Sequence, residues 1–351
     1  MSKGNRRKLT NRFAFISVLL FTMLISACGS GAGGNGASSS ASPADGQAAE
    51  SGAPAELAKV TQVTNWFAEA EHGGQYTALD KGFYKEAGLD MTITPGGPQV
   101  SAVQIVASGK AEFGMDQADA ILQAREQGIP IVAIAATFQK NPQVLIYHKE
   151  DSITGFGDLN GHQVFTASGS SYWEYIKKAY KLDKVKEMAY TGSLAMFMED
   201  KTALTQGYVT SEPYALAKEG VDVGYLLIHD SGYQPYANVL FTTEDMIQNK
   251  PELVRKFVEA SVKGWDYYKD HYEEMNPEIQ KRNPDMTLEQ MKYSAETQVD
   301  FVYGGDAATM GVGAMTAERW EKLADQMKDL GLISQDFDVS KAYTAEFLPG
   351  K

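Results

Sequence analysis

From residue 58 onward, the apolar and polar positions alternate between strand-like and helix-like periods. A strand is predicted over 59–66, followed by a helix over 74–88 whose last residue, Gly88, stands where a helix C′ glycine belongs. Residues 89–97 alternate with period two and end at a Pro-Gly turn, which predicts a second strand. The buried face of the first helix is marked by apolar residues at helical spacing: Tyr76, Leu79, Phe83 and Ala87.

The same alternation continues as far as residue 138. It predicts a short helix over 99–110, a strand over 111–115 and a helix over 116–128, with a glycine closing each helix. The run 129–138 is almost continuously apolar and rich in isoleucine and valine, which is typical of a strand buried on both faces. Strands and helices that alternate through short loops predict a mostly parallel sheet with helices on both faces.

The pattern restarts in the second half of the chain. Residues 144–150 are strand-like, and strands and helices alternate again over 156–243. From Lys250 onward the chain is predicted to be mostly helical, over 251–275, 287–302 and 316–331. The second of these helices begins with a capping-box pattern, Thr287 to Gln290.

These patterns predict an α/β protein of two lobes. The first lobe is expected to comprise residues 57–149 together with 241–351, and the second residues 150–240. The chain then crosses between the lobes twice, and two crossings make a hinge. Because ligands bind at the carboxyl ends of strands in such sheets, we expect a cleft between the strand ends of both lobes.

The N-terminal segment has the pattern of a secretory signal. A basic head precedes an apolar, uncharged run over 13–25 that is too short to form a stable membrane-spanning helix. The sequence LISAC, 24–28, matches a bacterial lipobox, which implies a signal peptide over 1–27 and lipidation of Cys28. The Gly-, Ser- and Ala-rich residues 28–56 are then expected to form a flexible tether to a membrane that holds acyl chains such as palmitate.

Composition narrows the classes of function. Cys28 is the only cysteine, so a chain lipidated there has neither a disulfide nor a thiol nucleophile. Loss of residues 1–27 removes five basic and no acidic residues, which changes the formal charge from −13 to about −18. So acidic a chain repels nucleic acid, and no nucleic-acid partner is expected. The five histidines show no metal-ligand spacing, so neither a metal nor a cofactor is expected.

The chain resembles the solute-binding lipoproteins of bacterial ABC importers, in the subgroup that binds nitrate, taurine, alkanesulfonates and thiamine pyrimidine precursors. Besides the lipobox and tether, three segments carry the resemblance: GQYTALDKGFYKEAGLDMTI (74–93), VASGKAEFGM (106–115) and NVLFTTEDMIQNKPELVRKFVEASVKG (238–264). The resemblance covers nearly the whole chain after the signal segment. It implies the two-lobed periplasmic-binding-protein type II fold and a monomeric, extracytoplasmic protein anchored to the cell membrane. It also implies an ABC permease and its ATPase as partners.

Candidate ligand contacts lie where predicted strands end. Trp66 is expected to stack on a flat ring, and Glu212 to accept hydrogen bonds from an aminopyrimidine edge. The helix start at His72 and the loop 168–171 offer backbone N–H groups to an anion or a carbonyl. Burial of Trp66, capping by the serines and solvation of Glu212 are the structural alternatives. The candidates are Asn65, Trp66, His72, Gly73, Tyr76, Gln117, Gln139, Ser168, Gly169, Ser170, Ser171, Tyr172, Glu212, Tyr214 and Asn238.

The side-chain types favour one kind of cargo. Apart from Lys140 the strand tips carry no Lys or Arg, whereas Glu69, Glu71, Asp116 and Glu212 favour a neutral or cationic heterocycle over nitrate or a sulfonate. The stretch NWFAEAEHGGQY, 65–76, is most similar to the corresponding loop of pyrimidine-precursor binders. The leading hypothesis is therefore a non-enzymatic importer subunit for a pyrimidine- or thiamine-precursor-like heterocycle.

Other functions on the same fold stay open. A nitrate, taurine, sulfonate or riboflavin binder and a sensor lipoprotein are alternatives, and the sequence names neither the exact ligand nor the permease. A pyrimidine-precursor-forming enzyme is a further alternative. The fungal synthases that the chain resembles carry a cysteine-rich active-site run, however, and this chain has none.

Overall fold

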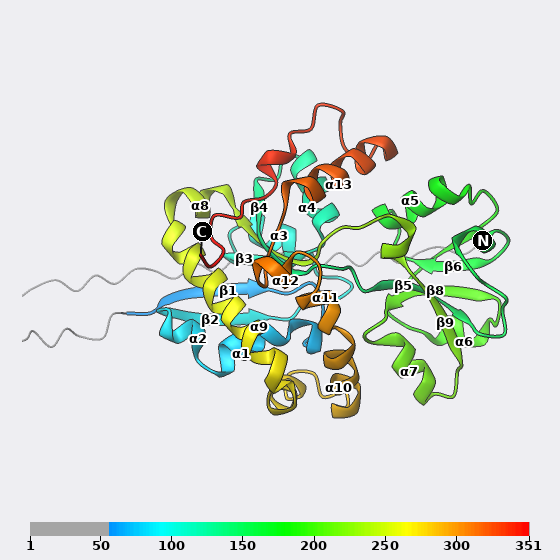
Figure 1. Cartoon of the computed structure of the whole chain (residues 1–351), viewed down its shortest axis with the longest axis horizontal. Coiled ribbons are helices and arrows are strands. Elements are labelled where there is room, and N and C mark those ends of the chain that lie inside the picture. Colours follow the sequence, from blue (N-terminus) through cyan, green and yellow to red (C-terminus); the bar gives the residue numbers. More distant parts are fainter. Residues whose placement is uncertain (1–55, 351) are drawn as a thin grey trace, which may run out of the picture. The chain divides into compact units, whose positions relative to one another are not determined.

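The computed structural model describes residues 56–350, which form two five-stranded sheets with flanking helices (Figure 1). The predicted signal peptide, Cys28 and nearly all of the predicted tether lie outside the described residues. The first sheet has the order β2-β1-β3-β10-β4. Its strands are β1 (Ala58–Val63), β2 (Leu89–Thr94), β3 (Phe113–Asp116), β4 (Ile131–Phe138) and β10 (Ala237–Thr243).

The second sheet repeats this arrangement with later strands. Its order is β7-β6-β8-β5-β9. The strands are β5 (Gln143–His148), β6 (Gln163–Thr166), β7 (Lys186–Ala189), β8 (Ala203–Tyr208) and β9 (Val223–Leu227). In each sheet four strands run in one direction and one runs against them, so the sheets are mixed and mostly parallel.

The reversed strands are the ones that follow the two crossings between sheets. Strand β5 comes directly after the crossing 139–142 and lies between β8 and β9, antiparallel to both. Strand β10 comes after the return crossing, 228–236, and lies antiparallel between β3 and β4. The predicted lobe boundaries need correction here, because they placed 143–148 with the first lobe and 237–240 with the second. Strand pairing puts β5 in the second sheet and all of β10 in the first.

The predicted helices are present, with three internal breaks. The predicted helix over 74–88 is divided into α1 (Gly73–Asp80) and α2 (Phe83–Glu86) by Gly82, whose φ of 79° is left-handed. The helix predicted over 287–302 is divided at Gln298 into α10 (Leu288–Thr297) and α11 (Val299–Tyr303). Helix α9 (Pro251–Gln280) kinks at His271, where φ is −129°. Thr287 caps α10 as predicted, since its Oγ1 accepts from the Gln290 N–H over 3.1 Å.

The helices and short 3-10 helices have the following bounds. In chain order they are α1 (Gly73–Asp80), α2 (Phe83–Glu86), α3 (Ala102–Ala107), α4 (Ala118–Glu126), α5 (Ser171–Tyr180), α6 (Ala195–Glu199), α7 (Glu212–Lys218), α8 (Glu244–Asn249), α9 (Pro251–Gln280), α10 (Leu288–Thr297), α11 (Val299–Tyr303), α12 (Ala307–Met310) and α13 (Ala317–Leu330). Short 3-10 helices are η1 (Ala70–His72), η2 (Phe156–Leu159), η3 (Ile228–Ser231) and η4 (Val339–Lys341).

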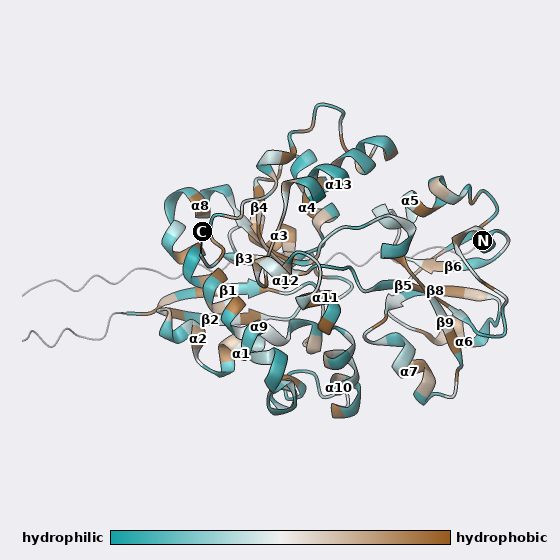
Figure 2. Ribbon diagram, in the orientation of Figure 1, coloured by the Kyte–Doolittle hydropathy of each residue, from teal (hydrophilic) through white to brown (hydrophobic). Residues whose placement is uncertain are grey.

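Burial of the strands explains their composition. Every residue of β4 is buried, as its continuous apolar run predicts, and parts of β6 and β8 have the brown colour of hydrophobic residues in Figure 2. Helix α13 places Trp320, Leu323 and Met327 in the core, and its other residues are mostly hydrophilic.

Among residues 56–350, no helix combines the length and the apolar character that crossing a bilayer requires.

Candidate functional site

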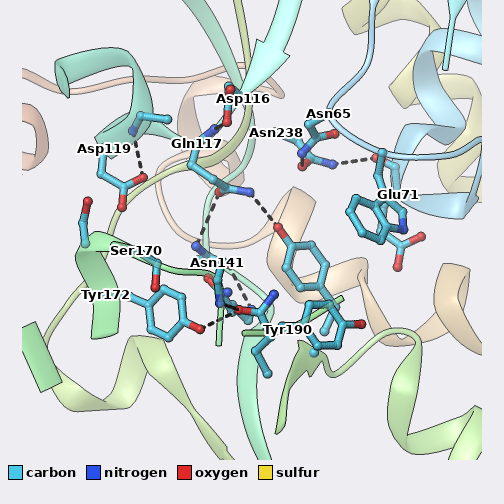
Figure 3. A pocket seen from close by; sticks show the side chains of 18 of the residues that line it. Asn65, Glu71, Asp116, Gln117, Asp119, Asn141, Ser170, Tyr172, Tyr190 and Asn238 are labelled. Carbon is cyan, nitrogen blue, oxygen red and sulfur yellow. Dashed lines mark hydrogen bonds between the residues drawn. The ribbon is translucent and has the colours of Figure 1, made fainter. Parts of the chain in front are cut away.

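A cavity of about 420 Å³ lies where strand ends of both sheets meet the crossing segments. This volume is within the range of small-molecule sites. Figure 3 shows Asn65, Glu71 and Asn238 on one side of it and Ser170 and Tyr172 on another. The lining residues are Asn65, Trp66, Glu69, Glu71, His72, Asp116, Gln117, Asp119, Ala120, Gln123, Asn141, Gln143, Ala167, Ser170, Ser171, Tyr172, Tyr190, Gln206, Gly207, Tyr208, Ser211, Glu212, Tyr233 and Asn238.

A chain of hydrogen bonds orders the wall that follows β1. The Asn238 Nδ2 donates to the backbone carbonyl of Glu71 over 2.9 Å, and Asn65 Nδ2 donates to Asn238 Oδ1 over 2.9 Å. The other end of the Asn65 amide, Oδ1, lies 2.9 Å from His72 Nε2. Asn238 holds its position with a φ of 45°, in the left-handed region that Asn tolerates better than most residues.

This series of hydrogen bonds determines which ring nitrogen of His72 carries the proton. A carbonyl only accepts, so Asn238 must present its NH₂ to Glu71 and its oxygen to Asn65. Asn65 then presents its own oxygen to His72, and therefore Nε2 carries the proton and Nδ1 does not. Burial lowers the pKa of His72 to about 3, which keeps the ring neutral. Its bare Nδ1 is buried and has no hydrogen-bonding partner.

Helix α4 links the two sheets across the cavity. Gln117, at its start, donates from Nε2 to the Tyr208 hydroxyl at the end of β8 over 2.6 Å. Gln123, six residues later, donates to Ser171 Oγ over 3.2 Å. Asp119 accepts a hydrogen bond of 2.8 Å from the Tyr233 hydroxyl, which belongs to the return crossing. The described structure is therefore one in which both walls of the cavity touch each other directly.

The wall after β6 is also hydrogen-bonded internally. The Tyr172 hydroxyl lies 2.6 Å from Thr166 Oγ1 and donates to Gln206 Oε1 over 2.9 Å. The same Gln206 oxygen accepts from the Ala167 N–H over 2.7 Å. These contacts orient the Tyr172 ring at the cavity.

The cavity lining carries five carboxyl groups. Burial is the main cause that raises the pKa of Glu212 to about 7 and that of Asp116 to about 6. Burial likewise raises the pKa of Glu69, and the negative charges of Glu71 and Glu212 raise it further. The pKa values of Glu71 and Asp119 are raised for the same first reason. No Lys or Arg belongs to the described lining, so the cavity is an acidic environment.

Most of the predicted contact residues are brought together here. The loop after β1 forms one wall of the cavity. Trp66 on this loop is only partly buried, and its ring lies edge-on to Phe67 at a centroid distance of 5.5 Å. The predicted residues that line the cavity are Asn65, Trp66, His72, Gln117, Ser170, Ser171, Tyr172, Glu212 and Asn238. Their part in binding remains a prediction.

Other predicted contacts lie outside the cavity lining, and three of them are in the protein interior. The Tyr76 ring is fully buried under the Arg282 guanidinium, 5.2 Å from its centroid. Gly73 packs so closely on Tyr268 that a Cβ would lie 2.4 Å from the ring. Buried Gln139 turns its amide to the carbonyls of Ala136 and Ala314, at 2.9 Å each.

The remaining predicted contacts are nearer the surface. Ser168 and Gly169 are exposed and lie outside the lining, so the loop contributes its last serines only. Tyr214 packs on the Tyr293 ring of α10, with centroids 5.1 Å apart.

Several lining residues were not predicted as contacts. Asn141 sits on the first crossing and Gln143 begins β5. Tyr190 follows β7, and Tyr208 is the last residue of β8. Tyr208 lies at the end of a strand, and this position was the available signal for it. Gln206 lies within β8, where only the direction of its side chain relative to the cleft could reveal it. Within residues 56–350, no group of three or more His, Cys, Asp and Glu side chains is placed to hold a metal ion.

Comparison with known proteins gives relatives of more than one function. The chain is 28% identical over 355 residues to the riboflavin-binding protein RibY of Chloroflexus aurantiacus, covering 95% of this chain and 96% of RibY. It is 23% identical over 303 residues to the 4-amino-5-hydroxymethyl-2-methylpyrimidine phosphate synthase of Legionella pneumophila, covering 83% of this chain and 92% of the synthase.

Among solved structures, the periplasmic aliphatic sulphonate binding protein SsuA of Escherichia coli superposes with a TM-score of 0.64. The identity is 14%, over 85% of this chain and 95% of SsuA, and it establishes the fold alone. The chain has the periplasmic binding protein fold that the sequence predicted. The family described as NMT1/THI5 like matches residues 69–275, and this confirms the resemblance found in the sequence. The chain therefore belongs to the NMT1/THI5-like family.

Proposed function

We propose that this protein is the extracytoplasmic solute-binding subunit of an ABC importer and captures a small planar heterocycle in the cavity between its sheets. The observation that carries the proposal is the lining itself. Trp66, Tyr172, Tyr190 and Tyr208 supply aromatic faces, and the described lining has acids and amides but no Lys or Arg. A flat neutral or cationic ring stacks on such faces, whereas nitrate or a sulfonate is bound best by positively charged groups.

The relatives support this class of cargo. RibY is named as a riboflavin binder, and the Legionella relative is named for a pyrimidine phosphate. Both compounds contain a flat nitrogen heterocycle. We favour a pyrimidine- or thiamine-precursor-like ligand and keep a riboflavin-like ring as the second candidate.

Capture would proceed by closure of the two lobes. Ligand contacts from both sheets exist together only when the walls are close, so a ligand shifts the population toward the closed form. The partners of this cycle would be an ABC permease and its ATPase. Lipidation of Cys28 would keep the protein at the outer face of the cell membrane.

A catalytic function is the second candidate, because the Legionella relative is named as a synthase. The chain contains one cysteine, Cys28, so the cysteine-rich run of the fungal enzymes it resembles has no counterpart in it. We therefore propose binding without turnover. Incubation with a bound pyrimidine, followed by mass spectrometry, should return the compound unchanged, and a new product would favour the enzyme.

A thermal-shift screen of the purified protein tests the binding function. The panel would contain hydroxymethylpyrimidine, formyl-aminopyrimidines, thiamine, riboflavin, nitrate, taurine and alkanesulfonates. A ligand at about a hundred times its dissociation constant stabilises the folded state by roughly 2.7 kcal/mol. We expect a shift with a heterocycle that is lost in Trp66→Ala and kept in Phe67→Ala, whose ring is exposed beside it. A shift with an anion alone would overturn the heterocycle assignment and leave the transport role in place.

A further inference from the structure

We propose that closure of the two lobes is coupled to uptake of a proton by Glu71, so that a rise in pH shifts the ligand-free chain from the closed form toward the open form. The inference rests on the lobe closure of the proposed function, and it holds whichever ligand the cavity takes. It follows from where Glu71 lies, from what covers it and from which groups face it.

Glu71 lies in η1, in the loop that follows β1, and it is 3% exposed. Both of its carboxyl oxygens are buried and have no hydrogen-bonding partner. An ionised carboxylate in such a place loses its hydration and receives no hydrogen bond in return, so the group favours its neutral form. Because the oxygens are shut off from the open space of the cavity, this cost is not relieved by a ligand there.

The second lobe provides part of the cover over Glu71. Thr210, which directly follows the second-lobe strand β8 by two residues, is fully buried beside the Glu71 carboxyl. Burial raises the pKa of Glu71, and the nearby Thr210 hydroxyl offsets only part of that rise. Since Thr210 belongs to the second lobe, opening of the lobes takes this cover away.

Helix α10 of the first lobe holds the covering segment in place. Ser294 Oγ donates to the Thr210 carbonyl over 2.6 Å. The same helix ends at Gln298, whose Nε2 donates to the Ala70 carbonyl, next to Glu71, over 3.0 Å. Helix α10 is thus bonded to both sides of the contact between the lobes. Opening must break the bond to Thr210 and admit water to Glu71.

The groups that face Glu71 from the surrounding elements bring no positive charge. They are Glu69 and His72 from its own loop, Tyr208 from β8, Glu212 from α7 and Tyr268 from α9. His72 is neutral because burial lowers its pKa to about 3. The two acids repel an ionised Glu71, and none of these five groups is a Lys or Arg that could compensate its charge.

The sign of the pH dependence follows from these surroundings. In the open form water reaches the carboxyl, and its pKa returns toward the ordinary value of 4.5. Because the closed-form pKa is raised, the proton supports closure fully below about pH 4.5, and this support is lost as the pH rises through the closed-form pKa. Burial shifts Glu69 and Glu212 in the same direction and His72 in the opposite one, so a variant of Glu71 is needed to isolate its part.

The distance between spin labels on the two lobes measures closure in the full chain. Val100→Cys in the first lobe and Met196→Cys in the second use exposed positions outside the cavity lining, and Cys28→Ser removes the chain's own thiol. Nearby loops of the two lobes meet in the closed form, where a Cβ built on Gly192 would lie 3.4 Å from Pro98. Double electron–electron resonance would give the ratio of short to long label distances at pH 5 and pH 8, with no ligand added.

We expect this closed-to-open ratio to fall as the pH rises. Glu71→Gln keeps the shape of the protonated side chain and cannot ionise. It should raise the ratio by no more than about fourfold at pH 5 and by at least about tenfold at pH 8. Glu289→Gln is the matched control, because it removes an exposed carboxyl from α10, and it should leave the ratio unchanged at both pH values.

Three results would overturn the proposal. The first is a difference between the wild-type protein and a folded Glu71→Gln protein, checked by its thermal transition, that does not widen from pH 5 to pH 8. The second is the absence of a short distance from both proteins at both pH values. The third is a pH response that persists in Glu71→Gln and disappears in Glu212→Gln, which would assign the proton to Glu212. No ligand is present, so a negative result here leaves the ligand screen untouched.

Discussion

Gln117 at the N-cap of α4 and Tyr208 at the end of β8 are joined by a hydrogen bond of 2.6 Å that connects the two walls of the cavity. The bond is made by protein groups alone, so part of the energy that holds the walls together exists before any ligand is present. A ligand then has to supply only the remainder, because it shifts an equilibrium by its differential affinity for the two states.

Removal of this bond should weaken both stability and binding. Tyr208→Phe keeps the ring and deletes the hydroxyl, and it leaves Gln117 Nε2 without that acceptor. We expect a loss of about 1 kcal/mol in the free energy of unfolding and weaker ligand binding. Denaturant unfolding and titration would measure the two effects. Tyr225→Phe on β9 is the matched control, since that ring is 47% exposed and outside the cavity lining; an equal effect in both variants would contradict the prediction.

Glu212 should make the ligand-free protein less stable at high pH. Its folded-state pKa of about 7 exceeds the ordinary value of 4.5, chiefly because the carboxyl is buried. The stability contributed by its proton is therefore complete below about pH 4.5 and is lost as the pH rises through about 7. We expect Glu212→Gln to be more stable than the wild-type protein by about 1 kcal/mol at pH 8, and this advantage to vanish by pH 5.

The comparison of variant with wild type is needed because His72 acts in the opposite sense. Burial lowers its pKa to about 3, so it costs stability as the pH falls below the ordinary value of 6.5. Thermal transitions of both proteins over pH 5 to 8 would isolate the contribution that titration of Glu212 makes to stability. A stability difference that is the same at every pH would show that Glu212 does not titrate in this range.

Arg319 on α13 should hold both crossing segments in place. Its guanidinium donates to the carbonyls of Gln139, over 2.6 Å, and Gln234, over 3.4 Å, and lies 3.7 Å from the centroid of the Tyr236 ring. Lys lacks the planar fork that makes these contacts together. We expect Arg319→Lys to lose about 2 kcal/mol of stability and to bind ligand more weakly, although Arg319 is outside the cavity lining.

Lys322 provides the control for Arg319. It lies on the same helix, is exposed, and contacts only the side chain of Gln234 in this region, over 3.0 Å. Lys322→Ala should change stability by less than about 0.5 kcal/mol and leave affinity unchanged. Comparable losses in the two variants would mean that any change on this face of α13 lowers stability and affinity, and that the contacts of Arg319 to the crossings have no special part in either.

Asn238 should show a measurable backbone cost. Asn238→Ala and Asn238→Gly both delete the hydrogen bonds to Glu71 and Asn65, but only alanine meets steric resistance at a φ of 45°. We expect both variants to be less stable than the wild-type protein, with glycine more stable than alanine by about 1 kcal/mol. Denaturant midpoints would measure this difference, and a less stable glycine variant would argue against strain at this position.

The sequence by itself determined the alternation of strands and helices and the general place of the site. Hydrophobic periodicity is a local property, so it located β1 to β4 and the later helices, and Gly88 and Gly331 take the left-handed conformation expected after a helix. Strand ends in a parallel sheet gather at one edge, which is why the sequence alone could predict that Trp66, Gln117 and Glu212 lie at the cavity.

Only the tertiary structure decided which strands pair after each crossing and where polar side chains point. Strands β5 and β10 are inserted between strands distant in sequence, and no local pattern encodes that choice. Gln139 follows a strand end as Trp66 does, yet its amide turns into the interior, where the carbonyls of Ala136 and Ala314 accept from it. Tyr76 lies in α1 and is buried beneath the Arg282 guanidinium. The bare Nδ1 of His72 likewise depends on Asn238, a residue far along the chain, since hydrogen-bond direction is set by partners in space.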